Sequence, residues 1–299
     1  MLYFDHSATT PIHPDVQSLI NELNHDIYGN PSSIHVAGRK AKHVVETARK
    51  QIADAVNCAP KEIIFTGGGS EANNQVLWSM IHRDRKHVIT SAIEHPAILA
   101  VLRQLEHLCI TYTIIPVNKY GWVNPEDIDA AIRDDTGLIT IMLANNEVGT
   151  VEPLQDIAKI AKKHDVLFHS DGIQVMGKLP IDVQELGMDM MSFSAHKFYG
   201  PKGVGALYIK EGISMKPLII GGSQEKSLRA GTENVGGIAG LGCAAELVTK
   251  SLSDVGPSLT ALEKQFKTKF SEQHANVIYN GFGDNHLPGL INITIPGIA

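Results

Sequence analysis

The chain has 299 residues, with 26 Lys and Arg against 32 Asp and Glu, so its formal net charge is −6. Hydrophobic residues make up 43% of the sequence, a value typical of globular proteins, which excludes an intrinsically disordered chain. The mildly acidic balance argues against non-specific binding to DNA or to a membrane surface. Because no apolar run approaches the roughly 18 residues of a membrane span and no secretory signal opens the chain, we expect a cytoplasmic protein.

Cysteines and histidines give no sign of a disulfide or metal framework. Cys58, Cys109 and Cys243 form no Cys-x-x-Cys pair, which fits a reducing compartment. None of the 14 histidines belongs to a His-Glu-x-x-His motif, and no set of Cys and His has zinc-finger spacing, so we expect no metal. A Gly-x-Ser-x-Gly motif is also absent, which argues against a serine hydrolase.

Short apolar runs alternate along the chain with amphipathic helical patterns. The runs are rich in Ile, Val, Thr and Phe and predict strands at 62–66, 87–91, 111–115, 138–142, 166–169, 190–194 and 204–209. The helical patterns cover 36–56, 71–82, 96–107, 125–133 and 154–164. This alternation predicts an α/β fold with a mostly parallel seven-stranded sheet and helices on both faces.

The last part of the chain has a different pattern. Residues 234–274 predict a long, mostly helical stretch that breaks near Gly256-Pro257. Strand-like runs follow at 277–280 and 290–295. This order predicts the start of a second, smaller α+β domain.

These patterns divide the chain into two predicted domains. We expect a large domain over 15–255 and a small domain that contains 1–14 and 256–299. One helix and two strands can hardly bury both faces of a sheet. We therefore expect the small domain to be incomplete, with a C-terminal remainder of the natural protein beyond Ala299.

Polar residues follow the predicted strands, at the sheet edge where α/β proteins place their sites. Lys197 comes just after strand 190–194, where partial burial would ease loss of its proton and allow a Schiff base. A surface lysine in a turn explains the same position equally well. Asp171 comes just after strand 166–169 and would either cap the next helix or pair with a protonated cofactor ring.

Three further segments suggest a ligand. Gly67-Gly68-Gly69-Ser70 opens a helix and would suit a phosphate, although it matches neither nucleotide fingerprint and an ordinary N-cap turn is the alternative. His95 would stack on a ring or transfer protons, or serve a structural role. Asn145 and Asn146 would hydrogen-bond a ring substituent, or form an Asx turn.

Taken together, these segments resemble the cysteine desulfurases, pyridoxal-phosphate (PLP) enzymes of fold type I. The resemblance spans the chain, and its motifs occur in family order. They are Asp5-His6-Ser7-Ala8-Thr9-Thr10-Pro11, Gly29-Asn30-Pro31-Ser32-Ser33, the loop 66–74, Glu94-His95, Asn145-Asn146-Glu147-Val148-Gly149, Asp171-Gly172-Ile173-Gln174, Ser194-Ala195-His196-Lys197 with Tyr199-Gly200-Pro201-Lys202-Gly203, and Arg229-Ala230-Gly231-Thr232.

The resemblance implies a PLP large domain and a role for each matching residue. Lys197 would carry PLP covalently, Asp171 would pair with its ring nitrogen, and His95 would stack on the ring and assist proton transfer. Lys197 and His95 are thus the implied catalytic residues. The remaining implied contacts are Asn146 and Gln174 to the phenolic oxygen, Gly69, Ser70, Ser194 and His196 to the phosphate, Thr232 to the phosphate in the partner subunit of a homodimer, and Asn30 to the substrate carboxylate.

The implied reaction takes sulfur from L-cysteine, releases L-alanine and passes a persulfide to an iron–sulfur scaffold or a tRNA-thiolation enzyme. In the family the attacking cysteine lies on a mobile loop of the C-terminal domain, so we expect it beyond Ala299. Cys58, Cys109 and Cys243 match no such loop, and we expect all three to be buried packing residues. The alternatives are a PLP-dependent cysteine or cystine C–S lyase, a selenocysteine lyase, or a non-catalytic PLP-binding protein.

Overall fold

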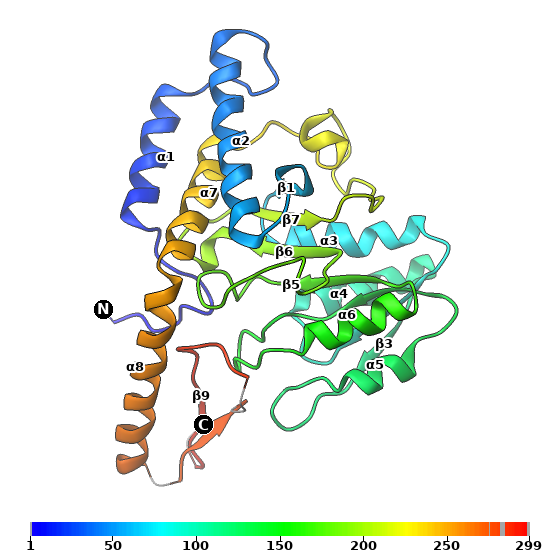
Figure 1. Cartoon of the computed structure of the whole chain (residues 1–299), viewed down its shortest axis with the longest axis vertical. Coiled ribbons are helices and arrows are strands. Elements are labelled where there is room, and N and C mark those ends of the chain that lie inside the picture. The colour runs from blue at the N-terminus through cyan, green and yellow to red at the C-terminus, as the bar shows by residue number, and fades with distance from the viewer. Residues whose placement is uncertain (1, 275, 282–284, 298–299) are drawn as a thin grey trace.

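A computed structural model describes residues 2–274, 276–281 and 285–297. At its centre is a seven-stranded sheet with the strand order β1-β7-β6-β5-β4-β2-β3 (Figure 1). The strands are β1 (Ile63–Thr66), β2 (His87–Ser91), β3 (Thr111–Ile115), β4 (Thr136–Thr140), β5 (Leu167–Asp171), β6 (Met190–Ser194) and β7 (Gly205–Ile209).

The predicted mostly parallel sheet is confirmed. Strands β3, β2, β4, β5 and β6 run parallel, whereas β7 is antiparallel to both of its neighbours. Strand β4 begins two residues earlier than predicted. Strand β5 extends through Asp171, because that residue still pairs with Ser192 of β6. The carboxylate therefore sits on the sheet itself and not in the loop after it.

Helices cover both faces of the sheet and enclose two cores. The main helices are α1 (Pro14–Asp26), α2 (Val36–Val56), α3 (Gly69–Ser79), α4 (Pro96–Leu105), α5 (Pro125–Ala131), α6 (Leu154–Lys163), α7 (Val235–Lys250) and α8 (Leu252–Gln273). On one face, α2, α5, α6 and α7 contribute Ile52, Ile128, Ile157 and Leu241 to one core. On the other, α3 and α4 contribute Leu77 and Leu102 to the second core.

Most helices begin at the prolines and capping residues that the sequence offers. Pro96 and Pro125 occupy the first turns of α4 and α5, as expected for a residue that lacks an N–H group. Pro153 instead caps α6, one position earlier. Helix α1 was not predicted, although Pro14 opens it and the His13 side chain accepts a hydrogen bond from the Asp15 N–H group.

The C-terminal helical stretch breaks at a different place from the one predicted. Helices α7 and α8 meet at Ser251 with a bend of 70°, and Pro257 lies inside α8. Within the described residues no single helix is long and apolar enough to cross a membrane, although the bent pair α7 and α8 passes that test together. The predicted terminal strands are present as a short antiparallel pair, β8 (Ile278–Asn280) and β9 (Asn292–Thr294). The division into two domains stays a prediction.

Two close approaches shape the sheet edge where the site lies. The N-terminal segment crosses the turn after β6, since the Thr10 N–H group donates to the His196 carbonyl at 2.9 Å. On the other side, β7 starts at Gly205, directly against the loop before α3. A Cβ atom at this glycine would lie 2.5 Å from the Phe193 carbonyl oxygen and 2.7 Å from the Gly68 backbone. The absence of a side chain thus lets strand and loop touch.

We predict that Gly205→Ala lowers the free energy of unfolding by about 1–3 kcal/mol, because the added methyl group overpacks rigid backbone. Urea unfolding followed by circular dichroism measures the change. Gly256→Ala is the matched control: this glycine lies in α8 with nothing within 4 Å of the added Cβ, and the substitution should stabilise the helix by up to about 1 kcal/mol. Equal stability of Gly205→Ala and the unchanged chain would contradict the close approach.

Candidate functional site

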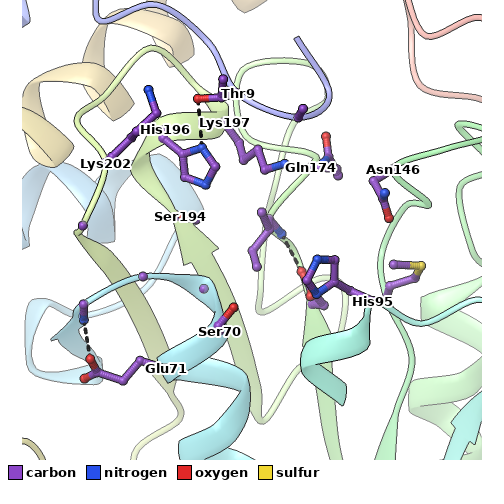
Figure 2. A pocket seen from close by; sticks show the side chains of 18 residues that line it. Thr9, Ser70, Glu71, His95, Asn146, Gln174, Ser194, His196, Lys197 and Lys202 are labelled. Carbon is purple, nitrogen blue, oxygen red and sulfur yellow. Dashed lines mark hydrogen bonds between the residues drawn. The ribbon is translucent and has the colours of Figure 1, made fainter. Parts of the chain in front are cut away.

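A pocket of about 540 Å³ opens at the carboxyl ends of the parallel strands (Figure 2). Nine of the residues singled out from the sequence line it, although they are spread over more than 120 positions of the chain. They are Gly69, Ser70, His95, Asn146, Asp171, Gln174, Ser194, His196 and Lys197.

Two predicted site residues do not line this pocket. Asn30, expected at the substrate carboxylate, is exposed in the loop between α1 and α2, where its Oδ1 atom accepts from the Ser32 N–H group at 2.9 Å. Within the single chain, the Asn30 side chain therefore stabilises its own turn and does not contact the pocket. Thr232 is exposed in the segment before α7. It was predicted to act in the partner's site, and that role stays a prediction.

The start of α3 carries the glycine-rich turn that was predicted to hold a phosphate, and we call this turn the cradle; the phosphate role stays a prediction. Helical hydrogen bonding begins with Ala72, whose N–H group donates to the Gly68 carbonyl at 3.1 Å, so the N–H groups of Gly69 and Ser70 precede the ladder. Gly68 has a φ of 149°, and a Cβ on Gly69 would lie 2.1 Å from the Ile173 side chain. Only glycine fits these positions, which leaves the donors and the helix dipole facing the pocket.

Asp171 is the buried carboxylate of the pocket, with 4% of its surface exposed. Its two oxygens accept from the Ile173 N–H group at 3.0 Å and from the Asn73 amide at 2.7 Å. Burial raises the pKa of Asp171, while these hydrogen bonds and the charges of His95 and Lys197 oppose that shift. A cation placed against this carboxylate would relieve its desolvation.

Lys197 reaches the pocket from the short helical turn after β6. Its Nζ atom donates to the Ser7 carbonyl at 2.5 Å, and the Gln174 amide donates to the same oxygen at 2.9 Å. Burial lowers the pKa of Lys197, although Asp171 and Asp5 raise it. A second lysine, Lys178, has its pKa lowered to about 8 by burial and by the Lys197 charge.

The two pocket histidines are held in different ways. His95 caps α4, since its Nδ1 atom accepts from the Ala97 N–H group at 3.0 Å, which leaves the Nε2–H side of the ring free for the pocket. Its ring and the Lys197 amine enter the pocket from different elements (Figure 2). The His196 Nδ1 atom pairs with the Thr9 hydroxyl at 3.1 Å, and burial lowers the pKa of His196.

These groups fit the cofactor that the resemblance implies. A cradle of helix N–H groups at one end suits a phosphate, and a buried carboxylate deep in the pocket suits a protonated ring nitrogen. A lysine with a lowered pKa in the same pocket suits a covalent link to an aldehyde. Gly69 strengthens the fit, because a Cβ there would lie 2.1 Å from Cδ1 of Ile173 and 3.4 Å from Cβ of Ser194, both pocket-lining residues, and would have to displace the Ile173 side chain.

Four residues in or next to the pocket were given no role from the sequence, namely Asn73, Thr9, Lys178 and Lys202. Asn73 is fully buried and holds Asp171, which is 98 residues away. A usable signal was its position three residues after Ser70, on the inward side of a helix whose start was already suspected. Thr9 and Lys202 line the pocket, and Lys178 hydrogen-bonds the Gln174 side chain at 3.2 Å. Thr9 and Lys202 lie inside motifs of the resemblance, which was the available signal, whereas nothing in the local pattern distinguishes Lys178 from a surface residue.

None of the three cysteines, all of which the structure describes, lines the pocket. Cys58 is half-buried, and burial raises the pKa of its thiol to about 12. Cys243 is half-buried in α7, with its thiol pKa also raised by burial. Cys109 was expected to be buried but is exposed, because it ends a helical turn in a left-handed conformation with a φ of 62°.

Glu94, next to His95, is a second buried carboxylate and lies behind the pocket. Its Oε1 atom accepts from the Ser91 hydroxyl at 2.6 Å and from the Met142 N–H group at 2.9 Å, so it ties the end of β2 to the end of β4. Among the described residues no group hydrogen-bonds to its Oε2 atom. Burial raises the pKa of Glu94 to about 8, which keeps the side chain mostly protonated at neutral pH.

Comparison with known proteins places the chain among relatives of one kind. Residues 2–299 match the family model described as aminotransferase class-V. A "Cysteine desulfurase IscS" from Dictyoglomus turgidum is 46% identical over 98% of this chain and 75% of the relative. One from Methanosarcina thermophila is 43% identical over 98% of this chain and 73% of the relative.

Solved structures agree with these sequences. A "NifS-like protein" has a TM-score of 0.96 and 35% identity, covering 99% of this chain and 82% of that one. A structure described as "SspA in complex with cysteine" has a TM-score of 0.89 and 37% identity, covering 99% of this chain and 84% of that one. The chain thus spans about three-quarters of the curated relatives and more than four-fifths of these structures.

We predict that Glu94→Gln makes the chain more stable than the original at pH 8.5 and nearly equal at pH 5. The folded pKa of Glu94, about 8, lies above its unfolded value of 4.5, so the folded state holds the proton more tightly and its stability falls as pH rises between these values. Glutamine resembles the protonated, neutral form of Glu94 and should remove this dependence of stability on pH. Urea unfolding at several pH values measures the dependence. An unchanged slope would show that Glu94 is already ionised in the folded chain.

Proposed function

The chain belongs to the aminotransferase class-V family, and on that premise we propose that it is a cysteine desulfurase, which removes sulfur from L-cysteine and leaves L-alanine. Its cofactor is PLP, as in the cysteine desulfurases to which it is similar. The observation that carries the proposal is the convergence of Asp171, Lys197 and the α3 cradle on one pocket. A solved relative in complex with cysteine supports the substrate.

The residues present would bind PLP by three separate contacts. Gly69, Ser70, Ser194 and His196 would hold the phosphate, Asp171 the ring nitrogen, and Asn146 and Gln174 the phenolic oxygen. Lys197 would carry the cofactor covalently. When bound, PLP supplies an electron sink that stabilises negative charge at the Cα atom of an attached amino acid.

Lys197 and His95 are the proposed acid–base groups. Burial lowers the pKa of Lys197, so its amine loses a proton more readily than a surface lysine and can accept one at Cα. The His95 ring is fixed by its hydrogen bond from the Ala97 N–H group, which presents the Nε2 side to the pocket. His95 would thus stack on the cofactor ring and move protons at its face.

A sulfur acceptor is the remaining requirement. A thiolate is the nucleophile that takes sulfur from cysteine, and a raised thiol pKa removes the thiolate. Cys58 and Cys243 have raised pKa values, and Cys109 lies outside the pocket. We therefore propose that the acceptor thiol is none of these three. Passage of a persulfide to an iron–sulfur scaffold or a tRNA-thiolation enzyme stays a prediction, as does the cytoplasmic location.

A homodimer is part of the proposal. Large apolar side chains are exposed on the loop between α1 and α2 (Tyr28 and Ile34), at the first residue of α2 (Val36) and on the loop after β7 (Ile220). Such exposure is typical of a surface that another chain covers. Thr232 lies near the end of the loop after β7, just before α7. It would contact the cofactor phosphate bound by the partner subunit.

The strongest second candidate is a PLP-dependent C–S lyase that acts on cysteine or cystine. The position of the three cysteines favours it, since a lyase releases its product without a protein thiol. The two functions differ in their product: a desulfurase with an acceptor thiol gives alanine, whereas a C–S lyase acting by elimination gives pyruvate and ammonia.

We predict that Lys197→Ala loses covalent cofactor, because Lys197 lines the pocket and is the pocket lysine whose charge interacts with Asp171. After incubation with PLP and borohydride reduction, mass spectrometry should find one reduced cofactor per original chain and none on the variant. Lys210→Ala, whose exposed side chain lies near Asp189, should label like the original. Full labelling of Lys197→Ala would overturn the assignment of this lysine.

We predict that the variant Cys58→Ala/Cys109→Ala/Cys243→Ala turns over L-cysteine as fast as the original chain, assayed in the presence of a small thiol that can accept sulfur. Alanine and pyruvate formation measure the two reaction types side by side. A loss of more than about tenfold in a variant that still binds PLP would place one of the three thiols in the reaction, since such a loss exceeds typical surface effects.

A further inference from the structure

The segment after β7 contains an unusual stretch of backbone. Glu225, Lys226 and Ser227 have φ angles of 46°, 58° and 65°, in the left-handed region that side chains other than glycine rarely adopt. Three such residues in succession cost free energy that the surrounding contacts must supply. We define this segment, residues 224–229, as the left-handed loop.

A buried ion pair anchors the left-handed loop. Glu225 accepts from the Arg49 guanidinium at 2.7 and 2.8 Å and from the Phe65 N–H group at 2.9 Å. Arg49 is 3% exposed and Glu225 5% exposed, and the guanidinium lies 4.7 Å from the Phe65 ring centre. Movement of the loop would separate the two partners and leave a buried charge unpaired, which is costly. The ion pair therefore holds the loop in this position.

The loop ends on the phosphate cradle. Gln75 of α3 donates to the Leu228 carbonyl at 2.8 Å, and the next residue, Arg229, donates from Nε to Glu71 Oε1 at 3.0 Å. Glu71 lies in the first turn of α3 and folds back, because its Oε2 atom accepts from the Gly67 N–H group at 2.8 Å. Figure 2 shows Glu71 next to Ser70 at the end of the pocket that forms the cradle.

This arrangement sets a carboxylate beside the place where a phosphate would bind. Glu71 lines the pocket, whereas Arg229 does not. A carboxylate near a phosphate dianion is repulsive, and the repulsion is strong where solvent is partly excluded. The Arg229 and Glu71 side chains are 24% and 17% exposed, so their ion pair is partly shielded from solvent. The guanidinium neutralises the carboxylate without itself lining the pocket.

We infer that Arg229 is a positioning residue for the cofactor phosphate: it neutralises and holds Glu71, which keeps the cradle open to an anion, and the Arg49–Glu225 pair holds the backbone that presents Arg229. Lys202, Lys197 and His196 attract the phosphate from the other side of the pocket. The inference rests on the proposed binding of PLP at this pocket and adds the control of its phosphate affinity.

The test compares two probes, PLP and pyridoxal, which differ only in the phosphate, on the full chain. Arg229→Gln should weaken PLP binding by about three- to tenfold, the range expected for loss of one partly shielded charge pair, and should leave pyridoxal binding unchanged. Arg229→Lys keeps the charge but loses the two-point contact with Glu71, so its affinity for PLP should lie between those of the original and of Arg229→Gln. Absorbance titration of bound cofactor measures both affinities.

The decisive variant is Arg229→Gln/Glu71→Gln. Glutamine at 71 still accepts from the Gly67 N–H group but carries no charge, so the double variant should regain the original affinity for PLP. If Arg229 instead contacts the phosphate directly, the double variant stays as weak as Arg229→Gln, and the inference is wrong. Equal weakening of PLP and pyridoxal would also overturn it, since that result indicates a general loss of structure.

Glu225→Ala tests the anchor. It should reduce PLP affinity in the same phosphate-dependent manner as Arg229→Gln, and Glu71→Gln should suppress the defect. If Glu225→Ala does not fold, the Arg229 series still decides the inference. An original chain that binds neither probe would refute the proposed PLP site itself, whereas normal binding by the original and by every Arg229 variant would refute only the role of Arg229.

Discussion

The site depends on one constraint, the burial of the Asp171 carboxylate at the end of a central strand. Water reaches only 4% of this residue, and its oxygens are held by the Asn73 amide and the Ile173 N–H group. Two hydrogen bonds do not replace the hydration of an ion, so the carboxylate needs a nearby cation. The sheet order places β5 beside β6, whose following turn carries Lys197, and thus brings an amine to the same pocket.

Charge at this edge of the sheet is arranged in opposed pairs around the pocket. The charge of Lys197 interacts with that of Asp171, and Arg229 forms an ion pair with Glu71 at the cradle. Lys178 lies close enough to Lys197 for like charge to add to the effect of burial on its pKa. A second amine near the first makes it costlier for both to be protonated, which favours a neutral amine on one of them at physiological pH.

Local pattern and long-range contact explain what could be predicted from the sequence. The seven strands and the helix 36–56 could be predicted because their signals, hydrophobic periodicity and a high content of β-branched residues, can be seen within a few neighbouring residues. The break at Ser251 could not, since a proline in the second turn of α8 costs one hydrogen bond and is tolerated there, whereas the position of the bend depends on packing. Six of the nine pocket residues were identified because they follow strands, and Gln174, Ser194 and His196 were identified through the resemblance, but Asn73 required knowledge of which helix faces β5.

The N-terminal segment shows why the lysine site involves more than the sheet. A single oxygen, the Ser7 carbonyl, accepts both from Lys197 and from Gln174, residues that lie far along the chain from it. A carbonyl oxygen makes a stronger hydrogen bond to an ammonium group than to a neutral amine, so this contact favours the protonated lysine. Covalent attachment of an aldehyde requires the neutral amine, and burial lowers the pKa of Lys197 toward that form. Gln174 remains as the second donor when the lysine leaves, which keeps the carbonyl satisfied and the segment in place.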